Sequence, residues 1–168
     1  MMLQVHKKIV LGQAVGGAVF NFFLNAATAY FTFPPIPSLP MFAKGNCVAG
    51  DTVGTSFFLP LITCLILTPV TKKIVKSQNI DLVKWSDLPA YARFGPSGAG
   101  ARGALIGLIC AFTIAPLTLG ILSAAGFTEM TRFQVTLYKA LYTVFLGILV
   151  TPVFAVRAFA GPQPTQPK

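Results

Sequence analysis

Long apolar runs separated by short polar segments dominate the hydrophobic pattern of this chain. The first run extends from Ile9 to Phe31 and contains no Asp, Glu, Lys, Arg or His. A helix of that length covers about 34 Å, slightly more than the roughly 30 Å hydrocarbon core of a bilayer. Comparable runs occupy residues 53–71, 103–125 and 133–156. The pattern therefore predicts an all-α integral membrane domain, 1–158, with four transmembrane helices in a bundle.

The segments between the runs differ in composition. The first is dense in proline, which excludes helix, and we expect it to lie on the membrane surface, to cap the bundle or to dock a partner. Residues 72–102 form the longest polar part and are predicted to be a cytoplasmic loop. The Pro- and Gln-rich residues 159–168 predict a disordered cytoplasmic tail. The prolines of the first segment are Pro34, Pro35, Pro37 and Pro40.

Several residues predict details of the spans. Asp51 and Thr52 are expected to start the second helix, and Thr128 or Thr131 to cap the fourth. Pro116 predicts a kink in the third. Lys139 is the one charge inside an apolar run, and its long side chain is expected to reach the membrane interface.

Composition supports a membrane protein. The chain is 54% hydrophobic and 10% charged, with a mean hydropathy of +0.71. Soluble domains carry about 25% charged residues. The 13 basic residues exceed the 4 acidic ones, and in a soluble protein that excess would suggest nucleic acid. Because most bases here flank apolar runs, we expect anionic lipid headgroups as partners and no nucleic acid. The predicted interfacial contacts are Lys72, Lys73, Lys76, Trp85 and Arg93.

The bases are distributed unequally between the two sides of the predicted bundle. Three of them, Lys44, Arg132 and Lys139, belong to one side. By the positive-inside rule, the richer side faces the cytoplasm together with both termini. The bases of that side are Lys7, Lys8, Lys72, Lys73, Lys76, Lys84, Arg93, Arg102, Arg157 and Lys168.

A polar stripe follows the first run. Gln13, Gly17, Asn21 and Asn25 recur every four residues and so share one helical face. Small and amide side chains on such a face let membrane helices approach and bond to one another. The stripe is therefore interpreted as a packing seam, with a polar pathway or ligand site as the alternative.

Two pairs of matching segments suggest an internal repeat. A Thr-Pro-Val sequence closes both the second and the fourth run, at 68–70 and 151–153. A Gly-x-x-x-Gly pattern begins the first and third runs, at Gly12/Gly16 and Gly103/Gly107. One hypothesis is therefore that the bundle consists of two tandem helical hairpins.

No pattern of reactive residues indicates catalysis. The four acids are scattered, the three cysteines lack C-x-x-C spacing, and neither G-x-S-x-G nor H-E-x-x-H occurs. The glycine-rich stretch before the third run has Arg102 at the eighth position of a would-be phosphate loop, with no Ser or Thr after it, so it is interpreted as a connector. We expect no catalytic residue, cofactor or metal.

The stretch from Gly50 to Val70, followed by bases, resembles small four-span bacterial inner-membrane proteins of unknown function. The resemblance implies a multi-pass protein of the bacterial inner membrane and carries no assigned activity. The leading hypothesis is a non-catalytic subunit that packs in a homo-oligomer or larger membrane complex. The alternatives are a small transporter or channel that uses the polar stripe, and an enzyme acting on lipids through Lys139, Arg132 and Glu129.

Overall fold

The computed structural model describes residues 4–33 and 38–161 of the chain. Within these residues, four helical segments are long and apolar enough to cross a membrane, as predicted. Short helices and a two-stranded ladder join them. The elements are α1 (Gln4–Thr32), β1 (Leu39–Pro40), α2 (Val48–Ser77), η1 (Trp85–Asp87), α3 (Ala90–Arg93), α4 (Ala99–Phe112), α5 (Ile114–Ala124), β2 (Glu129–Met130) and α6 (Arg132–Ala158).

Helix α2 is longer at both ends than the second apolar run. Cys47 is its N-cap, and the Cys47 thiol accepts a hydrogen bond from the Gly50 N–H at 3.3 Å. Asp51 therefore lies in the first turn, where its charge faces the positive end of the helix dipole, and is not the residue that starts the helix. The helix continues past 72–76 to Ser77, and Asn79 then turns the chain with a φ of 48°.

The third apolar run forms two helices. Pro116 has no N–H to donate to the carbonyl of Phe112, so the regular ladder breaks there. Thr113 lies between α4 and α5, and its hydroxyl donates to the Ile109 carbonyl at 2.6 Å. The predicted kink at Pro116 is thus a break between two helices.

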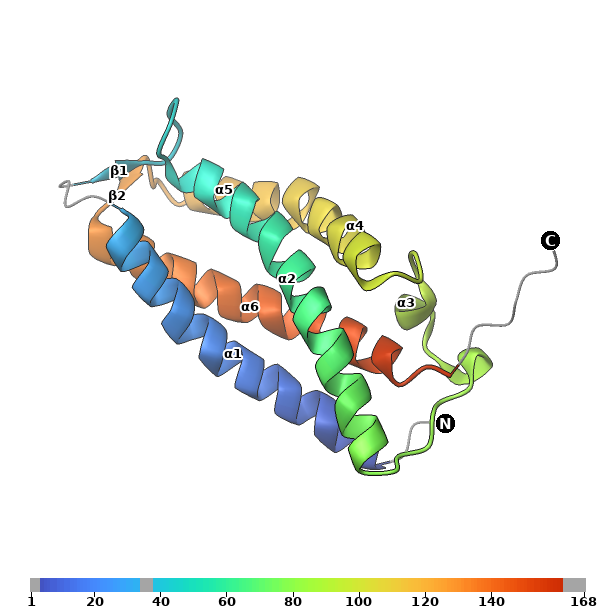
Figure 1. The fold of residues 1–168 in the computed structure, drawn as a ribbon. Coiled ribbons are helices and arrows are strands. Elements are labelled where there is room, and N and C mark those ends of the chain that lie inside the picture. Colours follow the sequence, from blue (N-terminus) through green and yellow to red (C-terminus); the bar gives the residue numbers. More distant parts are fainter. Residues whose placement is uncertain (1–3, 34–37, 162–168) are drawn as a thin grey trace.

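The four long segments pack in a crossed order. Helices α2 and α6 contact each other, α1 lies along α6, and α4 lies along α2 (Figure 1). The first helix of each predicted hairpin therefore packs chiefly on the second helix of the other. Close approach of α4 to α2 depends on glycine, because a Cβ at Gly107 would lie 2.5 Å from the Phe57 carbonyl oxygen. In α1, by contrast, a Cβ added at the matching Gly12 or Gly16 would have no atom within 4 Å.

The two ends of the bundle are closed differently. At one end, β1 pairs antiparallel with β2, and the Thr131 hydroxyl accepts from the Gln134 N–H in a capping box that starts α6. At the other, Val83 pairs with Ala160 and Phe159 is fully buried. Ordered structure thus reaches Gly161, beyond the predicted end of the domain. The rest of the predicted tail, 162–168, and Pro34–Pro37 lie outside the described residues.

Candidate functional site

A cavity of about 470 Å³ lies between α1 and α2. Its walls are mainly apolar side chains of both helices, and Thr151 of α6 also lines it. All four residues of the polar stripe line this cavity: Gln13, Gly17, Asn21 and Asn25. The stripe therefore faces the cavity, and part of it also contacts α6.

The members of the stripe have different partners. The Gln13 amide donates to the Thr71 hydroxyl at 2.9 Å and so links α1 to α2. Gly17 packs against Thr151, whose hydroxyl oxygen would lie 4.0 Å from an added Cβ. The Asn25 amide donates back to the Asn21 carbonyl at 3.0 Å. These contacts satisfy side chains at both ends of the stripe.

Asn21 lies in the middle of the stripe and is different. Among the described residues, no partner lies within hydrogen-bond distance of its side-chain amide, which borders the cavity. The space that it occupies exists because residue 147 is glycine, since a Cβ there would lie 2.9 Å from Asn21 Nδ2. The Asn21 amide can thus donate to, and accept from, a molecule bound in the cavity.

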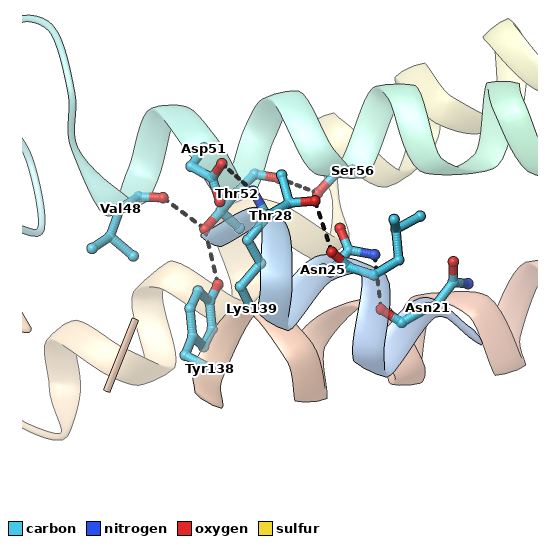
Figure 2. A network of polar contacts seen from close by, with 10 residues as sticks. Asn21, Asn25, Thr28, Val48, Asp51, Thr52, Ser56, Tyr138 and Lys139 are labelled. Atoms are coloured by element: carbon cyan, nitrogen blue, oxygen red, sulfur yellow. Dashed lines mark hydrogen bonds and ion pairs between the residues drawn. The ribbon is translucent and has the colours of Figure 1, made fainter. Parts of the chain in front are cut away.

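An ion pair joins α2 and α6 (Figure 2). Lys139 Nζ lies 2.6 Å from Asp51 Oδ1, and the Lys139 side chain is 8% exposed. The Lys139 side chain thus reaches an acid in the first turn of α2, and the expectation that it extends to the membrane interface stays a prediction. The pairing was missed because the two residues are far apart in the sequence.

Two tyrosines of α6 bond to hydroxyls of α2. Tyr138 Oη lies 3.0 Å from Thr52 Oγ1, and Tyr142 Oη lies 2.5 Å from Ser56 Oγ. Thr52 and Ser56 donate their own protons to the carbonyls of Val48 and Thr52, so the tyrosines are the donors (Figure 2). The two tyrosines are four residues apart, as are Thr52 and Ser56, and this spacing is a sequence signal for two facing stripes.

The residues predicted to meet lipid headgroups gather at the opposite end of the bundle. Lys72, Lys73 and Lys76 are exposed on the last turns of α2, and Arg93 is exposed at the end of α3. Trp85 is half-buried, and the guanidinium Cζ of Arg157 lies 3.6 Å from its ring centroid. Nearby on η1, a hydrogen bond from Ser86 lowers the pKa of the exposed Asp87 carboxyl.

Two arginines at this end are buried. Arg102 is 3% exposed and Arg157 is 6% exposed. Both line a second cavity of about 410 Å³, together with Lys72 and Trp85. Sequence reasoning placed these arginines with the other bases beside the spans, because nothing in their spacing distinguishes a buried base from an exposed one.

The described residues hold no group of three or more His, Cys, Asp or Glu arranged to bind a metal. Cys47, Cys64 and Cys110 are buried and free. No family model, curated protein or solved structure matches the chain. The resemblance of 50–70 to small four-span membrane proteins stays a prediction.

Proposed function

We propose that this chain is a non-catalytic integral membrane protein that binds an apolar molecule with one polar group in the cavity between α1 and α2. The observation that carries this proposal is the Asn21 amide, which has no hydrogen-bond partner among the described residues and borders a mainly apolar cavity. Asn21 is half-buried, and an amide without a partner in such a position costs free energy, which a bound hydrogen-bonding group recovers. A volume of about 470 Å³ also lies in the range of small-molecule sites.

Charge distribution supports an orientation in a membrane. The fold brings the amino end of α1, the last turns of α2, the start of α4 and the end of α6 to one end of the bundle (Figure 1). Nine of the described bases belong to that end, whereas Lys44, Arg132 and Lys139 belong to the other. We propose that the basic end faces the cytoplasm of a bacterial cell, in agreement with the positive-inside rule.

Retained small molecules provide the test of binding. The protein purified in neutral detergent is analysed intact by native mass spectrometry, which detects a bound lipid or other apolar molecule as added mass. The wild type is expected to retain one such molecule. Asn21→Leu removes the polar contact, and Ile62→Trp fills the cavity from the α2 wall, so both are expected to lose it.

The matched control is Thr28→Leu, which makes the same kind of change on an exposed residue of α1 outside the cavity. It is expected to retain the molecule. A wild type without added mass, or equal loss in Thr28→Leu and Asn21→Leu, would contradict the proposal. Flux in liposomes that Asn21→Leu abolishes would extend the proposal to transport.

A second candidate function is that of a membrane complex subunit. The observation that favours it is the outer face of α1, which exposes large apolar and aromatic side chains along its length. We propose this face as a helix-packing surface in a homo-oligomer or larger complex. Mass measurement in mild detergent tests it, and a strict monomer without a co-purifying protein would exclude it. The face includes Leu11, Val15, Val19, Phe23 and Phe31.

A further inference from the structure

The cavity at the basic end contains a buried cation with unused hydrogen-bonding capacity. Arg157 Nη1 is buried and has no hydrogen-bond partner among the described residues. Its guanidinium stacks on the Trp85 ring, which holds the group in place. The ring offers no acceptor to the N–H groups of the guanidinium. A buried guanidinium N–H without an acceptor is costly, and an anion in the cavity would supply one.

The second arginine shapes the loop that borders the cavity. Arg102 Nε donates to the Pro96 carbonyl at 3.1 Å, and its Nη2 donates to the Ser97 carbonyl at 2.6 Å. These bonds hold 96–97 against the first turns of α4 and keep the positive charge of Arg102 beside the cavity. The glycine-rich stretch interpreted as a connector is thus a fixed loop.

The start of α4 adds a third attractive element. Gly98 is the N-cap, and no side chain among the described residues caps this end. The first N–H groups of a helix have no partner within the helix and carry partial positive charge. Ser97, Gly98 and Ala99 line the cavity, so this helix end faces the same space as Arg102 and Arg157.

From these contacts we infer that the cavity formed by Lys72, Arg102, Arg157 and the amino end of α4 is a binding site for a phosphate group. Three basic side chains and a helix start favour a compact anion with several acceptor oxygens. No carboxylate of the described residues lines this cavity to neutralise the three bases. The phosphate belongs to an anionic lipid headgroup or to a free phosphate compound. The site is separate from the α1–α2 cavity and does not depend on it.

Trp85 provides a direct signal, because it is the only tryptophan in the sequence and stacks on Arg157. The full chain in neutral detergent is titrated with inorganic phosphate while the tryptophan emission is recorded. Saturable change is expected with phosphate and not with acetate at equal ionic strength. Equal responses to acetate and phosphate, or no response to any phosphate compound, would overturn the inference.

Substitutions distinguish phosphate binding in the cavity from attraction by general surface charge. Arg157→Gln is expected to weaken phosphate binding by about tenfold or more, because it removes a charged donor from a buried site. Lys72 and Lys73 are adjacent and both exposed, but only Lys72 lines the cavity. Lys72→Gln is expected to weaken binding about threefold and Lys73→Gln by less than twofold, as for an exposed charge. Circular dichroism monitors folding. If Arg157→Gln unfolds, the difference between Lys72→Gln and Lys73→Gln tests the site.

Two further titrations distinguish the sources of the phosphate. Short-chain phosphatidylglycerol and phosphatidylcholine are added below their critical micelle concentrations to the same detergent sample. Saturation by phosphatidylglycerol alone assigns the site to an anionic headgroup, and saturation by inorganic phosphate as well assigns it to the phosphate group itself. Equal weakening by Lys72→Gln and Lys73→Gln in every titration would show a diffuse basic surface and contradict a built site.

Discussion

Lys139 and Asp51 form an ion pair of 2.6 Å between the second turn of α6 and the first turn of α2. The lysine is nearly buried, whereas the aspartate side chain is 23% exposed. The pair lies beside the hydroxyl contacts of Tyr138 and Thr52 (Figure 2). Polar contacts therefore fix the relative register of the two central helices at this end.

Loss of the acid alone should destabilise the fold. Asp51→Asn leaves the Lys139 ammonium without its counter-charge in a nearly buried position, and we expect a loss of about 2 kcal/mol, between the values for exposed and fully buried pairs. Denaturant unfolding in detergent, followed by circular dichroism, measures the change.

The double variant Asp51→Asn/Lys139→Met is the control for this prediction. It removes both charges and is expected to recover most of the lost free energy of unfolding, because no unpaired charge remains. A double variant as unstable as the sum of its single variants would show that the two side chains do not interact.

The hydroxyl contacts predict an asymmetry between donor and acceptor variants. Ser56→Ala removes the acceptor and leaves the buried Tyr142 O–H unsatisfied, which should cost about 1–3 kcal/mol. Tyr142→Phe removes the donor, while Ser56 keeps its bond to the Thr52 carbonyl, and should cost about 1 kcal/mol. Thermal unfolding of the two variants compares these costs. A larger loss for Tyr142→Phe would reverse the assigned direction of the bond.

Two glycines in matching patterns should respond in opposite directions. Gly107→Ala forces α4 away from the Phe57 backbone, and we expect a loss of about 2 kcal/mol or more, as for other overpacked interfaces. Gly12→Ala meets open space and should stabilise α1 by up to about 1 kcal/mol through helix propensity. The free energies of unfolding in detergent provide the comparison, and similar effects at both positions would contradict the observed packing.

Cysteine labelling should report the proposed orientation. The three native cysteines are buried, so a membrane-impermeant maleimide is expected to react little with the parent chain. Lys44 and Lys73 are exposed at opposite ends of the bundle. In intact bacterial cells, Lys44→Cys should be labelled and Lys73→Cys should react only after lysis. Labelling of both variants in intact cells would exclude a spanning arrangement.

The helices could be predicted from the sequence because unbroken apolar runs leave few alternatives. Pro116 also marked the break between α4 and α5, since proline removes a specific hydrogen bond. The limits of α2 were harder to predict from the sequence. Three lysines follow Thr71 and end the apolar run, but lysine is compatible with helix and favours its carboxyl end. Hydropathy therefore located the apolar core of each helix better than its ends.

The candidate sites were only partly predictable. Every-fourth spacing brought Gln13 and Asn21 to one face, and the structure places that face on a cavity. Whether such a face meets a helix or a space depends on tertiary packing, which spacing alone does not determine. The buried Arg102 and Arg157 were counted only as topology signals, because their burial results from the junction of four distant segments.

The crossed order of the helices has a consequence for the route by which the chain assembles. Helix α1 precedes the other described helices in the chain, but its main packing partner, α6, follows all of them. During synthesis α2 and α4 are both made before α6, so they can pack together before the contacts between α1 and α6 form. The contacts of α1 thus close a long loop, which makes its docking a late and entropically costly step. The earliest helix of the chain completes the fold.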